Sequence, residues 1–188
     1  MKRIVLFASG SGSNVENIAN YFANRTDVQI EAVYCNNPEA YVIERCKKLG
    51  IPCRVFTREE FSKSDVVVNE LLALQTDLVV LAGFLWLIPK NLVATFPDKI
   101  INIHPALLPK FGGKGMYGHH VHEAVVANKE SESGITIHFV NEHYDEGKVI
   151  FQASCAVTEN DTADDVAKKI HLLEYEHFPK VIDKLLSE

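Results

Sequence analysis

Residues 101–110 read INIHPALLPK, and one pattern of the chain ends within this stretch while another begins. Two isoleucines alternate with Asn102 and His104, as expected of a strand with one polar face, and Pro105 ends the run. The two polar side chains should therefore lie about 7 Å apart on the same face. The ends of parallel strands are where α/β proteins bind ligands. The stretch predicts a functional site, although a pair of hydrogen-bonded core residues would show the same pattern.

Before this stretch, apolar runs alternate with helical patterns. Alternation of strand and helix predicts right-handed crossovers and a parallel sheet. We therefore predict an α/β fold with a Rossmann-like, mostly parallel, twisted sheet and flanking helices. The expected strands are 3–8, 30–35, 77–82 and 99–104, with a short edge strand at Val55, and the expected helices are 15–24, 39–49, 58–75 and 89–95.

After this stretch the pattern changes. Residues 105–118 are rich in glycine and proline and predict a long loop, a feature that is usually functional or disordered in compact domains. Strands at 135–140 and 149–157 follow, and a closing helix starts at a cap, Asp161 or Thr162. Its apolar stripe should hold Val166, Ile170, Leu173 and His177, and Pro179 should kink or restart it. We expect antiparallel C-terminal strands and one domain over 1–188, with two halves, 1–100 and 101–188.

Composition narrows the classes of function. Hydrophobic residues make up 47% of the 188 residues and charged residues 23%, as in ordinary globular proteins. A net charge of −6 and a pI near 5.8 argue against binding nucleic acid by phosphate neutralisation. The apolar run 4–8 is too short for a signal peptide, and no stretch approaches the roughly 18 apolar residues of a membrane span. We expect neither nucleic acid nor membrane as a partner.

The four cysteines show neither a C-x-x-C pair nor the spacing of a zinc site. Free, mostly buried thiols in a reducing cytoplasm are the expectation, and hence a cytoplasmic location. The sequence leaves open whether the protein is a monomer or a homodimer.

SGSGSN, residues 9–14, joins the first strand to the first helix. Glycines let the backbone approach a ligand, and a helix N-terminus offers free N–H groups, so a phosphate fits there. The third glycine of a dinucleotide fingerprint is replaced by Val15, and no acidic residue ends the second strand, which disfavours a nicotinamide cofactor. A plain tight turn remains the alternative.

Two later segments invite other interpretations. FGGKG, residues 111–115, lacks the P-loop spacing and is interpreted as a mobile loop that closes over substrate, with Lys114 available to an anion. HHVH, residues 119–122, has no carboxylate partner at zinc-site spacing. We predict the start of a helix with solvated histidines rather than a metal site.

A turn and an apolar segment complete the candidate site. NEHYDEGK, residues 141–148, is a polar connection between two strands, and it either forms a simple turn or supplies Asp145 as a partner for His104. LAGFLWLIP, residues 81–89, ends a central strand. Core packing explains most of it, but an aromatic ring and exposed backbone would also suit a flat heteroaromatic ligand.

Several segments together resemble the family of formyltransferases that use 10-formyltetrahydrofolate. In order, they are SGSGSN, LAGF, INIHPALLPKF, SGITIHFV and the aspartate of NEHYDEG. The likeness runs from about residue 2 to residue 180. The short length and the early Gly-Ser-Asn loop resemble the family members that formylate glycinamide ribonucleotide in purine synthesis.

The resemblance implies a phosphate/nucleotide-binding half over 1–100, a catalytic and folate-binding half over 101–188, and roles for matching positions. Asn102, His104 and Asp145 match the catalytic trio. The implied acceptor-binding residues are Gly12, Ser13 and Asn14 for the phosphate and Glu174 for the ribose. The implied folate-binding residues are Arg58, Leu85, Trp86, Leu87, Ile88, Asn102, Asn141, Glu142, His143, Tyr144 and Asp145. Two departures stand out: Trp86 replaces a residue that is basic in many relatives, and the loop 112–122 differs from the commoner form.

The implied chemistry is direct transfer. The acceptor amine attacks the formyl carbon of 10-formyltetrahydrofolate, Asn102 and His104 stabilise the oxyanion, and His104 with Asp145 moves the proton. This route implies no metal and no covalent enzyme intermediate.

Rival functions remain within and outside this family. A formyltetrahydrofolate hydrolase usually has an additional N-terminal domain, and a methionyl-tRNA formyltransferase has a further C-terminal domain and a basic surface; neither is expected here. A sugar-nucleotide formyltransferase and a catalytically silent folate- or nucleotide-binding module remain open.

Overall fold

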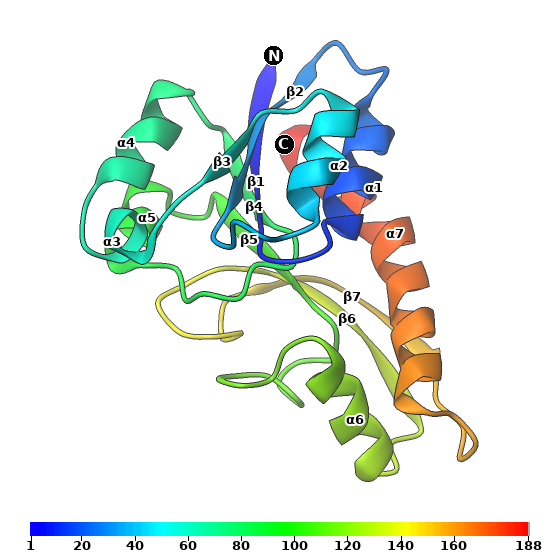
Figure 1. Cartoon of the computed structure of the whole chain (residues 1–188). Coiled ribbons are helices and arrows are strands. Elements are labelled where there is room, and N and C mark those ends of the chain that lie inside the picture. Colours follow the sequence, from blue (N-terminus) through cyan, green and yellow to red (C-terminus); the bar gives the residue numbers. More distant parts are fainter. Residues whose placement is uncertain (188) are drawn as a thin grey trace. The chain divides into compact units, whose positions relative to one another are not determined.

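A computed structural model describes residues 1–187 of the chain (Figure 1). They form two compact units, Met1–Ile101 and Asn102–Ser187, and the boundary between them in the sequence falls within strand β5 (Ile100–His104). The seven-stranded sheet has the order β3 (Cys53–Val55), β2 (Val28–Cys35), β1 (Lys2–Ala8), β4 (Leu78–Leu81), β5, β6 (Glu132–Phe139) and β7 (Val149–Ala156). Strand β1 pairs in parallel with β2 and β4, and β2 with β3, whereas β6 and β7 are antiparallel. The predicted α/β class, with a mostly parallel sheet and antiparallel C-terminal strands, is confirmed.

In the first unit, α1 packs against α2 and β2, and α4 packs against α3 and α5, on the other side of the strands in Figure 1. Strands β1 and β4 are buried almost throughout, which explains their continuous apolar sequences. The elements are β1 (Lys2–Ala8), α1 (Ser13–Phe22), β2 (Val28–Cys35), α2 (Val42–Leu49), β3 (Cys53–Val55), α3 (Arg58–Ser62), α4 (Val66–Ala73), β4 (Leu78–Leu81) and α5 (Lys90–Thr95). The short edge strand at Val55 is confirmed as β3.

In the second unit, α6 packs against α7, and α7 packs against β6 and β7. Its elements are the end of β5, α6 (His119–Ala127), β6 (Glu132–Phe139), β7 (Val149–Ala156) and α7 (Ala163–Ser187). Residues 105–118 contain neither helix nor strand, as predicted.

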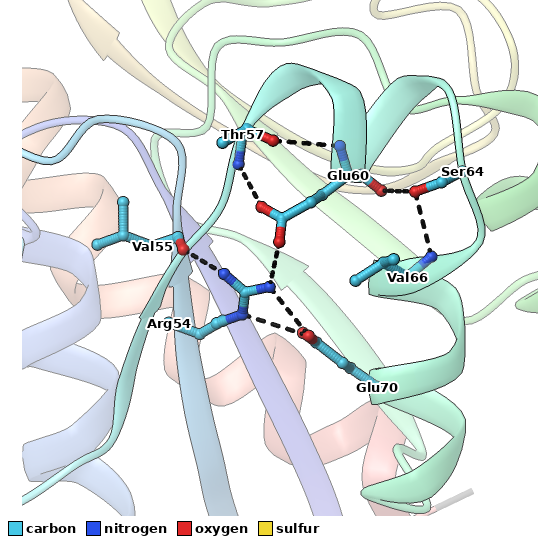
Figure 2. Close-up of polar contacts among 7 residues, drawn as sticks. All are labelled: Arg54, Val55, Thr57, Glu60, Ser64, Val66 and Glu70. Carbon is cyan, nitrogen blue, oxygen red and sulfur yellow. Dashed lines mark hydrogen bonds and ion pairs between the residues drawn. The ribbon is translucent and has the colours of Figure 1, made fainter.

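The predicted single helix over 58–75 is wrong, because the chain forms two helices there. Figure 2 shows the reason: the Ser64 hydroxyl donates to the carbonyl of Glu60 and accepts from the amide of Val66. A serine that bonds the backbone in this way competes with helical hydrogen bonds. Both helices are nevertheless tied together, since Arg54 forms ion pairs with Glu60 of α3 at 2.7 Å and Glu70 of α4 at 3.0 Å.

The closing helix α7 differs from the prediction in two respects. Thr162 caps it, with reciprocal hydrogen bonds between Thr162 and Asp165, but the helix continues through Pro179 instead of restarting there. The buried stripe is Val166, Ile170, Glu174, Phe178 and Ile182. Leu173 and His177 are half-buried, so Glu174 occupies a position where an apolar residue was expected.

The four cysteines are free thiols, as predicted; Cys35 and Cys46 are buried, while Cys53 and Cys155 are half-buried. Among residues 1–187, no helix combines the length and apolar character needed to cross a membrane.

Candidate active site

Two neighbouring strands present the polar groups of the second unit. Strand β5 carries Asn102 and His104, and β6 carries His138, which is 2% exposed. His138 Nδ1 lies 2.9 Å from the carbonyl oxygen of Phe139, which can only accept. In the neutral ring Nδ1 therefore bears the proton, and Nε2 accepts from Asn102 Nδ2 at 3.2 Å. His138 thus orients the Asn102 amide and leaves its second N–H free to donate elsewhere.

His138 is a site residue that the sequence reasoning missed. A signal was available, because ITIH at 135–138 repeats the alternation of INIH at 101–104. Two adjacent strands with the same alternation can place their polar side chains on one face of the sheet.

Asp145 completes this cluster from the turn between β6 and β7. Its Oδ2 lies 3.5 Å from His104 Nδ1 and its Oδ1 lies 3.6 Å from His138 Nε2. The amide of Gly113 also donates to Oδ2, at 3.0 Å. The structure therefore brings the predicted trio together, with His138 joining Asn102 to the carboxylate.

The turn that carries Asp145 is held in a strained conformation. Asp145 has φ +55°, a left-handed value that costs a non-glycine residue about 1–3 kcal/mol and tends to occur at functional sites. Two residues later, Gly147 passes so close to β6 that an added Cβ would lie 1.6 Å from the carbonyl oxygen of Phe139. Glycine is thus required where the chain turns back beside the strand.

Burial and pairing set the charges of the cluster. Burial lowers the pKa of His104 below its ordinary value and outweighs the opposing effects of Asp145 and the Phe111 carbonyl. Burial also raises the pKa of the Asp145 carboxyl, but the close contact with His138, the positive charge that His104 or His138 carries when protonated, and the hydrogen bond from Gly113 outweigh it, leaving that pKa below its ordinary value. At neutral pH the site therefore holds a carboxylate beside a neutral His104.

The predicted loop 105–118 lies against this cluster. The carbonyl oxygen of Phe111 is 2.7 Å from His104 Nε2, so this nitrogen donates to it. Thr136 of β6 fixes the beginning of the loop, because its hydroxyl accepts from the amide of Leu108 and donates to the carbonyl of Ala106. A carbonyl oxygen therefore already occupies the position to which His104 directs its proton.

In the first unit, the predicted phosphate loop precedes α1. Gly12 has φ +74° and approaches Val42 so closely that a Cβ there would lie 2.4 Å from its side chain. Arg45 of α2 donates to the carbonyl of Ser11, and the amide of Val42 donates to the carbonyl of Gly10. The helix begins at Ser13, and the first amides of a helix have no acceptors within the helix itself.

Arg58 and Trp86, both predicted to bind folate, contact each other. The guanidinium of Arg58 lies over the indole of Trp86, 4.3 Å from its centroid, in a cation–π arrangement. Trp86 packs against Phe56, Phe61 and Phe84, at centroid distances of 6.0, 5.9 and 6.3 Å. Arg58 therefore places a positive charge over Trp86, the position at which the sequence departs from the expected basic residue.

The backbone of the segment around Trp86 is fixed, but its side chains are not uniformly buried. The amide of Leu85 donates to the Ser9 hydroxyl at 3.0 Å, so this amide is already paired. Leu85 and Leu87 are exposed while Ile88 is buried. Core packing therefore explains Ile88 and leaves two large apolar side chains at the surface.

The remaining predicted residues lie in the second unit. Glu142, His143 and Tyr144 are exposed, and Asn141 accepts a hydrogen bond from the amide of His143. Glu174 is buried in α7, and its Oε2 lies 3.2 Å from His171 Nδ1. That contact raises the pKa of His171.

The histidine cluster 119–122 begins helix α6, as predicted, but its histidines are not all solvated. His119 and His120 are exposed, whereas His122 is buried. Across the described chain, 1–187, no three His, Cys, Asp or Glu side chains gather in a way that could hold a metal ion.

The fold and the site together define an α/β protein with an Asn-His-Asp cluster at the end of a central strand. The family model for formyl transferase matches residues 2–182, and the chain therefore belongs to the formyl transferase family. The resemblance found in the sequence is thereby confirmed.

Individual relatives cover the chain along its whole length. It is 38% identical to the chloroplastic phosphoribosylglycinamide formyltransferase of Arabidopsis thaliana and 35% identical to the phosphoribosylglycinamide formyltransferase of Bacillus subtilis, each over 100% of this chain. The chain spans 66% of the Arabidopsis protein's own length and 62% of that from Vigna unguiculata, but 96% of the Bacillus subtilis protein.

A crystal structure of phosphoribosylglycinamide formyltransferase from Streptococcus pneumoniae matches with a TM-score of 0.86 at 38% identity, covering 98% of this chain and 99% of that one. The corresponding structure from Bacillus halodurans gives a TM-score of 0.89 at 35% identity, covering 100% and 96%.

Proposed function

We propose that this protein transfers the formyl group of 10-formyltetrahydrofolate to the glycinamide amine of glycinamide ribonucleotide, a step of purine biosynthesis. The observation that carries the proposal is the buried cluster in which Asp145 contacts His104 and His138 orients Asn102. The names of the relatives support the same reaction. The co-substrate is 10-formyltetrahydrofolate, and the chemistry requires no metal.

In the proposed reaction, the amine nitrogen attacks the formyl carbon, and negative charge develops on the formyl oxygen. Asn102 donates its free N–H to that oxygen, an interaction worth roughly 10²–10³ in rate. The second donor is His104 Nε2, which now donates to the Phe111 carbonyl at 2.7 Å and would donate to the formyl oxygen in its place. The C–N bond to folate N10 then breaks.

The reaction also moves one proton from the attacking amine to folate N10. His104 can carry it at Nε2, because its pKa lies below the ordinary value and the ring is neutral at neutral pH. Once substrate displaces the Phe111 carbonyl, the ring proton can sit on Nδ1 beside Asp145, so that Nε2 takes the amine proton, donates to the formyl oxygen as imidazolium and then passes the proton to N10. The Asp145 carboxylate, 3.5 Å from His104 Nδ1, stabilises the imidazolium that forms. General acid–base transfer of this kind contributes roughly 10²–10⁴ in rate.

We assign substrate binding to the remaining residues. The first amides of α1, with Gly12, Ser13 and Asn14, bind the acceptor's phosphate, and Glu174 binds its ribose. Arg58, Trp86 and the backbone of Leu85–Ile88 bind folate, as does the segment Asn141–Asp145. The Arg58–Trp86 pair supports this assignment, since it joins a flat aromatic surface to a positive charge.

The test is a spectroscopic assay of folate product with and without glycinamide ribonucleotide. Product that requires the ribonucleotide supports the proposal. Product and formate without it would identify a hydrolase, and folate binding without turnover would identify a binding module or a different acceptor.

Variants then test the assigned chemistry. Asn102→Ala and His104→Ala should each lower kcat at least about 100-fold. The matched control is His120→Ala, which replaces an exposed histidine of α6 and should leave turnover unchanged. Asp145→Asn should lower kcat more than it raises either KM. Wild-type turnover in Asn102→Ala or His104→Ala would overturn the mechanism, and a change confined to KM in Asp145→Asn would remove its proton role.

A further inference from the structure

The guanidinium of Arg54 lies between two carboxylates that belong to different helices (Figure 2). Arg54 is the middle residue of β3, and its Nη2 lies 2.7 Å from Glu60 of α3 and 3.0 Å from Glu70 of α4. The three side chains are 34%, 31% and 32% exposed, and ion pairs as exposed as these contribute little to stability. The consequence of the contact lies in what Glu60 holds with its other oxygen.

Glu60 uses both of its carboxylate oxygens. Oε1 accepts from Arg54, while Oε2 accepts from the backbone amide of Thr57 at 2.7 Å. The Thr57 hydroxyl in turn accepts from the amide of Glu60 at 3.2 Å, so the two residues form a capping box at the start of α3. The Arg54 guanidinium and the Thr57 amide lower the pKa of this carboxyl, which is therefore ionised at neutral pH. Arg54 thus holds the carboxylate in the place from which it caps the helix.

The capped end of α3 carries Arg58, which is the first residue of this helix and follows Thr57 directly. The helix has only five residues, too few to be stable through its own backbone hydrogen bonds. Its direction therefore depends on its cap and on the packing of Phe61 against Trp86, whose ring centroids lie 5.9 Å apart. Arg58 is itself exposed, so its place over the indole is set by the backbone at the start of α3.

We propose that Arg54 is a positioning residue of the folate site, which acts through Glu60 to hold Arg58 over the indole. This inference rests on the proposed function and adds to it a residue that acts on folate binding only through Arg58. Glu70 contacts the same guanidinium but belongs to α4, so it has no part in holding Arg58.

The two glutamates provide a matched test. Glu60→Gln and Glu70→Gln each remove one negative charge and one ion pair of Arg54, but only Glu60→Gln loosens the helix that carries Arg58. Glutamine is itself a capping-box residue, so Glu60→Gln keeps the fold. Glu60→Gln should raise the KM for 10-formyltetrahydrofolate about two- to fivefold, the effect of losing one partly exposed ion pair, with kcat within about twofold of wild type. Glu70→Gln should leave both constants unchanged.

The sign of the change separates positioning from simple charge effects. Folate carries glutamyl carboxylates, so the removal of a nearby negative charge would by itself lower its KM. Positioning predicts the opposite, a rise in Glu60→Gln. A fall in this KM, or equal values in Glu60→Gln and Glu70→Gln, would overturn the inference.

A double-mutant cycle tests the route through Arg58. Arg54→Met keeps the apolar stem of the side chain without its charge, and it should raise the folate KM as Glu60→Gln does. In an Arg58→Ala background it should raise this KM no further, because the group that it positions is absent. Effects of Arg54→Met and Arg58→Ala that multiply independently would refute the proposed route.

The single tryptophan, Trp86, provides a measurement that does not need the reaction. Arg58→Ala removes the cation from the indole and should shift its fluorescence emission. Glu60→Gln should shift the emission in the same direction, and Glu70→Gln should not. Calorimetric titration with 10-formyltetrahydrofolate should show the same two- to fivefold loss of affinity in Glu60→Gln alone.

These measurements separate the inference from the proposed function. If the wild-type protein formylates the ribonucleotide but Glu60→Gln changes neither the emission nor the affinity for folate, the proposed function stands and the role of Arg54 falls. If no turnover occurs yet emission and folate affinity change as expected, the role of Arg54 stands and the proposed reaction falls. A shifted emission with unchanged folate affinity would also overturn the inference.

Discussion

Replacing His122 with phenylalanine should make the fold less sensitive to acid. The ring titrates near 6.5 in the unfolded chain, whereas burial lowers its pKa to about 4 in the folded protein. Between these pH values the unfolded chain binds a proton that the folded chain does not, so the free energy of unfolding falls as the pH falls. The difference between 6.5 and about 4 corresponds to about 3 kcal/mol, at roughly 1.36 kcal/mol per pKa unit.

Urea unfolding at pH 7 and pH 4 measures this effect. From pH 7 to pH 4, the free energy of unfolding should fall by about 3 kcal/mol more in the wild-type protein than in His122→Phe. The lowered pKa of His104 and the raised pKa of His171 act in both proteins and cancel to first order in the comparison. In the control His120→Phe, the free energy of unfolding should fall by as much as in the wild-type protein. Equal losses in wild type and His122→Phe would refute the conclusion that this ring is buried in its neutral form.

Three further substitutions test the site and its support. His138→Phe should lower kcat about 10- to 100-fold with little change in either KM, because Asn102 loses the acceptor that orients it. His138→Gln should recover part of this loss, and a full kcat in the phenylalanine variant would contradict the positioning role. Gly147→Ala should lower the free energy of unfolding by about 1–3 kcal/mol in urea, because the added carbon would lie 1.6 Å from the carbonyl oxygen of Phe139. Unchanged stability would show that the turn relaxes freely. Arg58→Ala should raise the KM for folate while lowering stability by less than about 1 kcal/mol, and an unchanged folate KM would remove Arg58 from the site.

The sequence by itself determined the fold class and the candidate catalytic residues. Strand periodicity, helix caps and glycine-rich turns are local signals, and they located the parallel strands and the loop 105–118 and narrowed the cap of α7 to Asp161 or Thr162. The alternation in INIH placed Asn102 and His104 on one face of a strand, and the family resemblance added Asp145. These features follow from neighbours in the chain, which a sequence displays directly.

Tertiary structure decided what depends on residues far apart in the chain. His138 acquires its role because β6 lies beside β5, 36 residues away, where its ring meets the Asn102 amide. The break in the predicted helix 58–75 is, by contrast, local: Ser64 bonds the backbone of Glu60 and Val66, and helix propensity alone does not show such bonds. His122 and Glu174 are polar residues whose burial depends on the packing of α6 against α7. Hydrophobic pattern predicts which residues a protein buries on average, but the packing of each helix decides which polar groups are buried with them.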